Sequence, residues 1–342
     1  MQKRTTTPII ALALLLLFGQ GLFAQNKKLA QTGIQILSVP PDARAAAMGE
    51  AFTTIAGQSN SIFYNPANLA RTSGTYSFSI NQNNWIADIK QASGSFSYNP
   101  MNGNLGVLAL SYITVNYGDL YGTRVDPSTD KGYIDTGIFS PSAFVLGVGY
   151  AKSLTDRFSV GGQVKYVSQT LGESLVPVGD YRETGETEII NYKAGVLAYD
   201  FGTLYRTGYK SLVFGMSVRN FSREVVYETE GFQLPLNFQI GISMNVFDFF
   251  ESFADGSQAL LVAIDATHPR AFGERVNIGA EYMFYDIFAL RGGYKINYDQ
   301  VSYTVGFGIQ KEFGDRKVAF DYSLTPFGLF DTVQRMSFRL VL

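Results

Sequence analysis

The residue types that enzymes use most often for catalysis are scarce in this chain. It contains one histidine, His268, in the stretch AIDATHPR, and no cysteine. A serine-type triad needs a histidine that contacts both a nucleophile and a carboxylate. In the alternating segment around it, Leu260, Val262 and Ile264 share one face, so parity places His268 on that face and Asp265 on the opposite one. We therefore expect His268 to be an ordinary residue at a strand end, and we predict no catalytic site.

Metal, phosphate and nucleic-acid chemistry are also poorly supported. Zinc sites of the usual kind need clusters of cysteine and histidine, which this composition does not offer. No Gly-Lys-Ser/Thr phosphate loop is present. The acidic run Gly185-Glu186-Thr187-Glu188 could bind a cation, but such a run is more typical of a solvated loop. A net charge of -2 argues against a nucleic-acid partner. We predict neither a cofactor nor a metal site.

The N-terminus indicates export. Lys3 and Arg4 precede an apolar stretch, and Leu22-Phe23-Ala24 stands before Gln25, which predicts a signal peptide over residues 1–24. A transmembrane anchor would need about 20 apolar residues, which is more than this run offers. Aromatic residues make up 14% of the chain and charged residues 16%, against about 25% charged in typical soluble domains. This composition favours an integral outer-membrane protein that crosses the bilayer with strands.

Apolar and polar residues alternate from about residue 75 to the end, which is typical of strands with one apolar face. A soluble sandwich would show the same alternation, but three features favour an all-β, antiparallel transmembrane barrel. Tyrosine and phenylalanine cluster at strand ends, the short connections (100–103, 154–157, 285–287, 314–317) alternate with longer ones (117–140, 172–188, 222–236, 325–332), and an alternating segment reaches Leu342. We predict about fourteen strands, at residues 75–84, 90–99, 104–116, 141–153, 158–170, 189–200, 211–221, 236–247, 259–267, 274–284, 288–297, 300–312, 316–324 and 333–342.

Charged residues within these strands should line the lumen, on the face opposite the apolar one. The turn at 285–287 would set Phe284 opposite Phe288, and hence Glu281 opposite Arg291, as an inward cross-strand ion pair. The full set predicted to point inward is Lys165, Lys193, Arg219, Asp265, Glu281, Arg291, Lys295, Asp321, Arg335 and Arg339.

Residues 25–72 do not alternate and are rich in small side chains, which divides the chain into a signal peptide, this segment, and a barrel over 73–342. A barrel of about fourteen strands has a lumen too wide for its own side chains to fill. We therefore expect residues 25–72 to form a hatch inside it. Within SIFYNPANLA, we expect Pro66 to end a helix or turn and Asn65 to hydrogen-bond locally.

Two stretches of this segment resemble a known family. Asp42-Ala43-Arg44-Ala45-Ala46-Ala47-Met48-Gly49, followed by Asn65-Pro66-Ala67, is similar to the N-terminal signature of the PorV/PorQ family of type IX secretion, within the FadL-like group of outer-membrane barrels. The resemblance implies a fourteen-stranded barrel with an N-terminal hatch. Its motif residues here are Asp42, Arg44, Met48, Gly49, Asn65, Pro66 and Ala67.

Two functions remain open from this resemblance. In the first, the protein helps to deliver secreted cargo with a C-terminal signal domain, together with a translocon partner. In the second, it is a FadL-like passive channel for hydrophobic small molecules; a purely structural role is a third possibility. The first is favoured by apolar residues in the expected external loops, namely Ile134, Ile138, Phe139 and Phe232, since exposed apolar groups favour partner binding.

Overall fold

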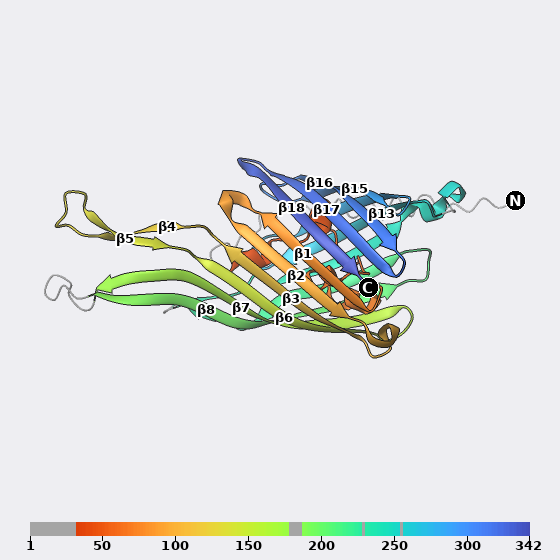
Figure 1. The fold of residues 1–342 in the computed structure, drawn as a ribbon, viewed down its shortest axis with the longest axis horizontal. Helices are drawn as coiled ribbons and strands as arrows, with labels where there is room; N and C mark the ends of the chain where they lie inside the picture. The colour runs from red at the N-terminus through yellow and green to blue at the C-terminus, as the bar shows by residue number, and fades with distance from the viewer. Residues whose placement is uncertain (1–31, 178–186, 228–229, 254–255) are drawn as a thin grey trace.

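The computed structural model describes residues 32–177, 187–227, 230–253 and 256–342. Fourteen antiparallel strands close into a barrel in which each strand pairs with its neighbours along the sequence, and β1 pairs with β18 at the seam (Figure 1). The barrel strands are β1 (Tyr76–Asn84), β2 (Lys90–Tyr98), β3 (Val107–Asn116), β6 (Ser142–Ser153), β7 (Phe158–Pro177), β8 (Thr187–Arg206), β9 (Val213–Ser222), β12 (Asn237–Asn245), β13 (Gln258–Pro269), β14 (Arg275–Phe284), β15 (Phe288–Ile296), β16 (Tyr303–Phe313), β17 (Arg316–Phe327) and β18 (Phe330–Val341).

The outer face of the barrel is apolar, as the alternation predicts. Along β3, for example, Leu108, Leu110 and Tyr112 are exposed, while Ala109 and Ser111 between them are buried. Such an apolar exterior is typical of barrels that cross an outer membrane. The closed fourteen-stranded sheet confirms the predicted all-β barrel and its number of strands. None of the helices within the described residues has the length and apolar character needed to cross a bilayer.

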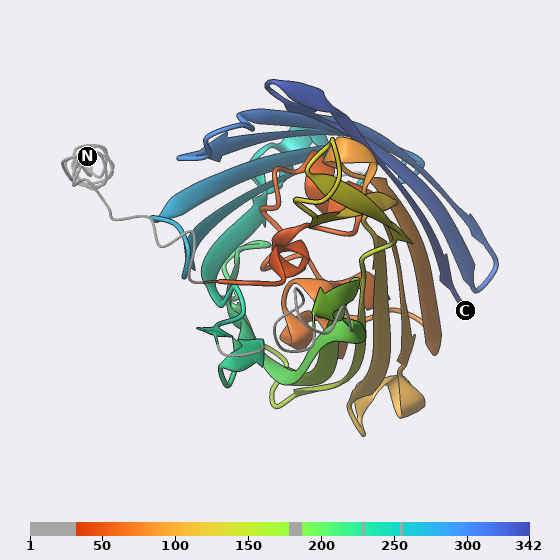
Figure 2. The ribbon, with the colours of Figure 1, turned by 90° about the vertical axis from the view of Figure 1, so that its left-hand side faces the viewer.

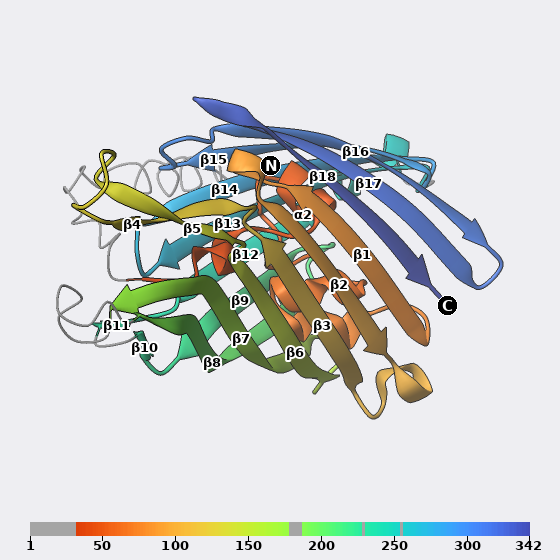
Figure 3. The same ribbon diagram turned by 60° about the vertical axis from the view of Figure 1, so that its left-hand side comes forward.

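The two ends of the barrel differ, and we call them the loop end and the turn end. Two hairpins lie at the loop end outside the barrel sheet, β4 (Leu120–Val125) with β5 (Tyr133–Phe139) and β10 (Val225–Tyr227) with β11 (Glu230–Phe232) (Figure 3). Strands β7 and β8 also run past the barrel wall beside the first hairpin (Figure 1). Thr75 donates its backbone N–H to Leu342, so the start and finish of the barrel meet at the turn end.

Several connections differ from those predicted. Strands β7 and β8 are both longer than their predicted ranges, because their backbone ladder continues beyond a bulge between Thr170 and Gly172. The expected 117–140 loop contains the hairpin β4–β5. The expected long loop at 325–332 is wrong, since β17 and β18 leave only Gly328 and Leu329 between them.

Residues 32–72, which we call the N-terminal segment, lie inside the barrel (Figure 2). Their elements are short: η2 (Gln35–Ser38), α2 (Ala43–Ala47), η3 (Ser59–Phe63) and η4 (Pro66–Arg71). The small residues Ala43, Ala45 and Ala47 are fully buried, which lets α2 pack closely against β15 to β18. The connections between barrel strands hold four further short helices, η5 (Ile86–Asp88), η6 (Pro100–Gly103), η7 (Val246–Phe249) and η8 (Glu251–Phe253).

The inner face of the barrel is not polar throughout. From β3 to β8, buried apolar side chains such as Val145, Val167 and Val196 point inward and pack against Ile34 and Ile36 of the N-terminal segment. In β8 the even-numbered residues therefore face the lumen, whereas the prediction placed the odd-numbered Lys193 there. The inward placement of Lys193 is therefore wrong: it is exposed and shares the outward face with Leu197.

Candidate functional site

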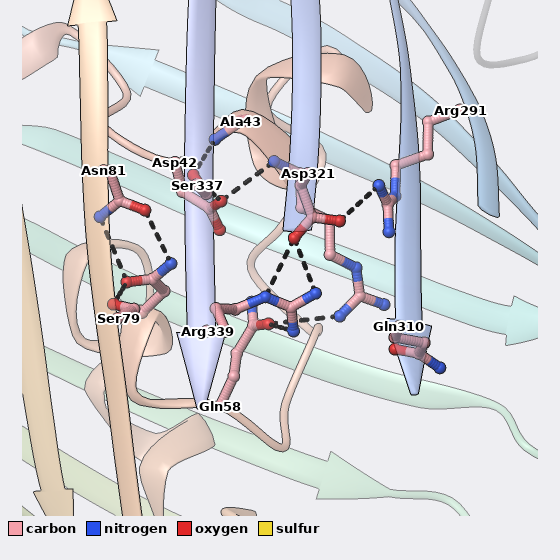
Figure 4. A network of polar contacts seen from close by, with 12 residues as sticks. Asp42, Ala43, Gln58, Ser79, Asn81, Arg291, Gln310, Asp321, Ser337 and Arg339 are labelled. Atoms are coloured by element: carbon pink, nitrogen blue, oxygen red, sulfur yellow. Dashed lines mark hydrogen bonds and ion pairs between the residues drawn. The ribbon is translucent and has the colours of Figure 1, made fainter. Parts of the chain in front are cut away.

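The signature around Asp42 caps a helix and joins it to the last strand of the barrel. Asp42 is the N-cap of α2, and its Oδ1 accepts a hydrogen bond from the backbone N–H of Arg44 at 3.0 Å. The Ser337 hydroxyl donates to the same oxygen at 3.1 Å and accepts from the backbone N–H of Ala43 at 2.9 Å (Figure 4). Burial raises the pKa of the Asp42 carboxyl. The cap therefore serves both the helix and its attachment to β18.

Arg44 connects the N-terminal segment to the barrel wall through a buried carboxylate. Its Nε and Nη2 donate to the two oxygens of Glu281 at 2.7 and 2.6 Å, the bidentate geometry of a strong ion pair. Glu281 lies opposite Arg291 in the β14–β15 register, with Arg291 Nε 2.5 Å from its Oε2. The register agrees with the one predicted from the turn at 285–287.

This ion pair continues into a chain of alternating charges. Arg291 Nη1 lies 2.8 Å from Asp321 Oδ1, and Arg339 Nη2 lies 2.8 Å from the other oxygen of Asp321 (Figure 4). Gln58 of the N-terminal segment accepts from Arg339 at 2.5 Å. We call these residues the lumen ion network: Arg44, Gln58, Glu281, Arg291, Asp321 and Arg339. The network holds the N-terminal segment at two points to β14, β15, β17 and β18.

Gly49, the last residue of the stretch from Asp42 to Gly49, lies in a sharp turn after α2. Gly49 has φ +63°, and a Cβ at this position would lie 3.2 Å from the carbonyl oxygen of Ile278. Its backbone N–H donates to Thr304 Oγ1 at 3.0 Å, and the same hydroxyl donates to the carbonyl of Ala47 at 2.9 Å. Met48 is fully buried beside it. Both the left-handed conformation and the close backbone approach explain why glycine is placed here.

The Asn65-Pro66-Ala67 step begins a helix. Pro66 is the first residue of η4, where its missing N–H costs nothing, so the expectation that it ends a helix or turn is wrong. Asn65 is the N-cap and accepts from the N–H of Ala67 at 3.1 Å. Its amide also donates to the carbonyls of Thr53 at 2.8 Å and Thr203 at 3.0 Å. One side chain thus ties η4 to another part of the N-terminal segment and to β8.

Most of the other predicted lumen residues bond within the barrel interior. Asp265 accepts from the backbone N–H groups of Phe52 at 2.8 Å and Thr53 at 2.9 Å. Lys165 of β7 pairs with Asp200 of the neighbouring β8 at 2.7 Å, and Lys295 forms an ion pair with Glu50. Arg219 donates to the carbonyl of Phe63 at 2.7 Å, and Arg335 donates to the carbonyl of Pro40 at 3.2 Å.

The four apolar loop residues have different surroundings. Ile138, on β5, is 61% exposed, whereas Ile134 and Phe139 of the same strand are half-buried. Phe232 is also half-buried, and it packs against Leu234, Val225 and Ile34 in the apolar interior. The hairpin adds exposed residues that the sequence did not single out, above all Tyr121 at 82% and Val125 at 78%.

A cavity of about 540 Å³ lies between the N-terminal segment and the loop end of the barrel wall. It was not predicted, because its lining comes from nine strands, their connections and the N-terminal segment. Trp85, Phe272, Tyr298 and Phe327 supply aromatic surface. Its cations are Arg219, Arg275, Lys295 and Arg335, and its carboxylates are Glu50 and Asp299.

His268 lies apart from this interior. His268 is exposed on the outer face, where its Nδ1 lies 3.2 Å from Glu274, while Asp265 points inward. Within the described ranges, no three histidine, cysteine, aspartate or glutamate side chains are grouped so that they could hold a metal ion. The predicted signal peptide and Gly185 and Glu186 of the acidic run lie outside the described residues.

Comparison with solved structures shows the same fold in other barrels. The toluene transporter TodX of Pseudomonas putida matches with a TM-score of 0.55 and 13% identity over 86% of this chain and 96% of that chain. The toluene transporter TbuX of Ralstonia pickettii has a TM-score of 0.50 and 15% identity over 87% and 96%. A FadL homologue of Pseudomonas aeruginosa has a TM-score of 0.50 and 9% identity over 92% and 98%. At these identities the likeness shows the fold alone.

Comparison by sequence identifies the family. No curated protein matches the chain. A family model described as type IX secretion system protein PorV matches residues 23–257, which is more than half of the chain. This range includes both signature stretches and the strands from β1 to β12. The chain belongs to the PorV family of type IX secretion system proteins.

Proposed function

We propose that this protein is an outer-membrane component of type IX secretion that helps to deliver cargo with C-terminal signal domains to the cell surface. Membership of the PorV family is the observation that supports this most directly. The lumen also supports it, because the N-terminal segment fills much of the interior and is tied to the wall by the lumen ion network. A barrel blocked in this way suits a role at its external surface better than one as an open pore.

In this proposal the loop end faces the cell exterior. An even-stranded outer-membrane barrel places both termini and its short turns on the periplasmic side. The turn end of this barrel contains Leu342 and the two-residue turn between β16 and β17. The hairpin β4–β5 and the extensions of β7 and β8 would then stand outside the membrane, where a translocon subunit or cargo domain can reach them.

The hairpin β4–β5 is the proposed contact with the partner. Tyr121 pairs with Ile138 across the hairpin, and Val125 pairs with Tyr133, so apolar groups line up along it. Exposed apolar groups of this kind are typical of interaction sites, where tyrosine is enriched.

Deletion of the gene tests the function. We expect less surface display of proteins bearing type IX C-terminal signal domains, and unchanged uptake of fatty acids and hydrocarbons, in a secretome and an uptake assay on the same strain. Normal secretion with reduced uptake would refute the proposal in favour of a channel.

Point substitutions test the surface. Tyr121→Glu should weaken co-purification with the translocon or cargo, because it puts a charge in an apolar contact, while the barrel still assembles. Tyr209→Glu is the matched control, since Tyr209 is also exposed but lies in the β8–β9 turn at the other end. Equal loss with both variants would count against the hairpin as the contact.

The alternative is a FadL-like passive transporter of hydrophobic small molecules. The cavity of about 540 Å³ is an observation in its favour, because it lies within the lumen and has aromatic walls. Its four cationic side chains weigh against an uncharged ligand, since desolvating them without a counter-charge is costly. The uptake arm of the deletion experiment distinguishes this alternative.

A further inference from the structure

The cavity at the loop end has an excess of positive charge. Among its lining residues four are cationic and two are carboxylates. Lys295 pairs with Glu50, so one of the cations and one of the carboxylates neutralise each other. The guanidinium of Arg219 reaches a neutral carbonyl, that of Phe63, at 2.7 Å. The cavity therefore has room for a negative charge that the chain itself does not supply.

Arg335 is the most deeply buried of the four cations. It is only 1% exposed, and its hydrogen bonds go to the neutral Pro40 carbonyl at 3.2 Å and the Thr325 hydroxyl at 3.0 Å. Across the described part of the chain no carboxylate forms an ion pair with it. Arg339, four residues along the same strand, has Asp321 at 2.8 Å. A buried guanidinium without a carboxylate is costly in free energy unless another anion completes its environment.

The walls around Arg335 suit a planar or aromatic group. Its guanidinium lies 5.2 Å from the ring centroid of Trp85, which packs edge-on against Phe327 at 4.8 Å. Arg275 lies 3.9 Å from the Phe272 ring and 4.2 Å from the Tyr298 ring. Burial raises the pKa of Tyr298 further above its usual range, so its hydroxyl stays protonated at neutral pH.

We propose that this cavity binds a small organic carboxylate with an aromatic or planar body. The carboxylate would accept hydrogen bonds from the Arg335 guanidinium, and the body would lie among Trp85, Phe272 and Phe327. A volume of about 540 Å³ lies within the range of sites for small molecules. This binding does not depend on the proposed role in secretion, and it differs from binding of an uncharged hydrocarbon because the anion supplies the missing charge.

The chain contains its own reporter for this site. Trp85 lines the cavity and is the single tryptophan of the sequence. We would titrate the full protein in a non-ionic detergent with dansylglycine, an aromatic carboxylate, and follow energy transfer from tryptophan to the dansyl group. We expect saturable transfer, and at least about 10-fold weaker binding of the uncharged dansylglycinamide, because hydrogen bonds to charged groups are the stronger ones. Equal affinity for the acid and the amide, or no saturable transfer with either, would overturn the proposal.

A pair of variants locates the charge that matters. Arg335→Gln should weaken dansylglycine binding by about 10-fold or more. Arg316→Gln is the control, because Arg316 is an exposed arginine at the turn end of β17 and does not line the cavity. Its affinity should stay within about twofold of the unmodified protein. Similar losses in both variants would refute a specific site at Arg335. If Arg335→Gln does not assemble, the comparison of acid and amide on the unmodified chain still decides the question.

Discussion

Replacing Glu281 by glutamine should release the N-terminal segment from the barrel wall. The substitution keeps the shape of the side chain and removes the charge that binds Arg44 and Arg291, at a position that is 4% exposed. Breaking a buried ion pair by removing one partner typically costs about 3–5 kcal/mol. Arg291 keeps Asp321 as a partner, so most of the cost falls on Arg44 and the lower figure applies. About 3 kcal/mol corresponds to an opening equilibrium roughly 100-fold more favourable.

Hydrogen exchange measures this opening directly. The amides of Ala46 and Met48 donate within α2, and their exchange should become about 100-fold faster in Glu281→Gln, while amides of β17 and β18 keep their rates. Glu312→Gln is the control, because Glu312 is 68% exposed in its ion pair with Lys317 and such pairs contribute about 0–1 kcal/mol. Unchanged exchange in α2, or an equal increase in the control, would refute the role assigned to the Arg44–Glu281 contact.

Three further predictions concern the N-terminal segment. Asn65→Ala should lower the free energy of unfolding by about 2–3 kcal/mol, measured by denaturant titration in detergent, because two carbonyls and one N–H lose a buried partner. Gly49→Ala should destabilise by about 1–3 kcal/mol more than Gly314→Ala in the same titration; both have φ near +60°, but only Gly49 has backbone atoms within 4 Å of an added Cβ. Asp42→Asn should keep the helix cap, and stability should fall less in this variant than in the unmodified protein as the pH rises above about 3.9. The sign follows because burial raises the pKa of Asp42 in the folded state, so ionisation disfavours folding over that range; an equal fall in thermal unfolding temperature for both proteins would contradict it.

The barrel itself could be predicted because its exterior imposes a strict pattern. A lipid-facing wall requires an apolar residue at every second position, so each strand of the second half shows in the sequence which of its residues face outward. The turn at 285–287 then fixed one register, and with it the neighbours Glu281 and Arg291.

The interior was less predictable because its contacts join residues far apart in the sequence. Lys193 was misplaced since β8 turns valine and alanine inward against η2, and nothing within β8 itself shows that an apolar helix packs there. The bidentate contact of Arg44 with Glu281 spans 237 residues. An arginine among buried alanines was a usable signal that a lumen carboxylate would be required, but it did not indicate which one. The cavity around Arg335 depends on loops whose arrangement no local pattern determines.

The position of the N-terminal segment also constrains the order of assembly. It precedes β1 directly, and β1 pairs with β18, the last strand of the chain, to complete the wall. Once these two edges join, a segment of this bulk could enter or leave only through an end of the barrel, past the contacts that hold it. We therefore expect the segment to be enclosed while β18 is still unpaired, so that the late β1–β18 ladder traps it kinetically rather than by equilibrium affinity alone.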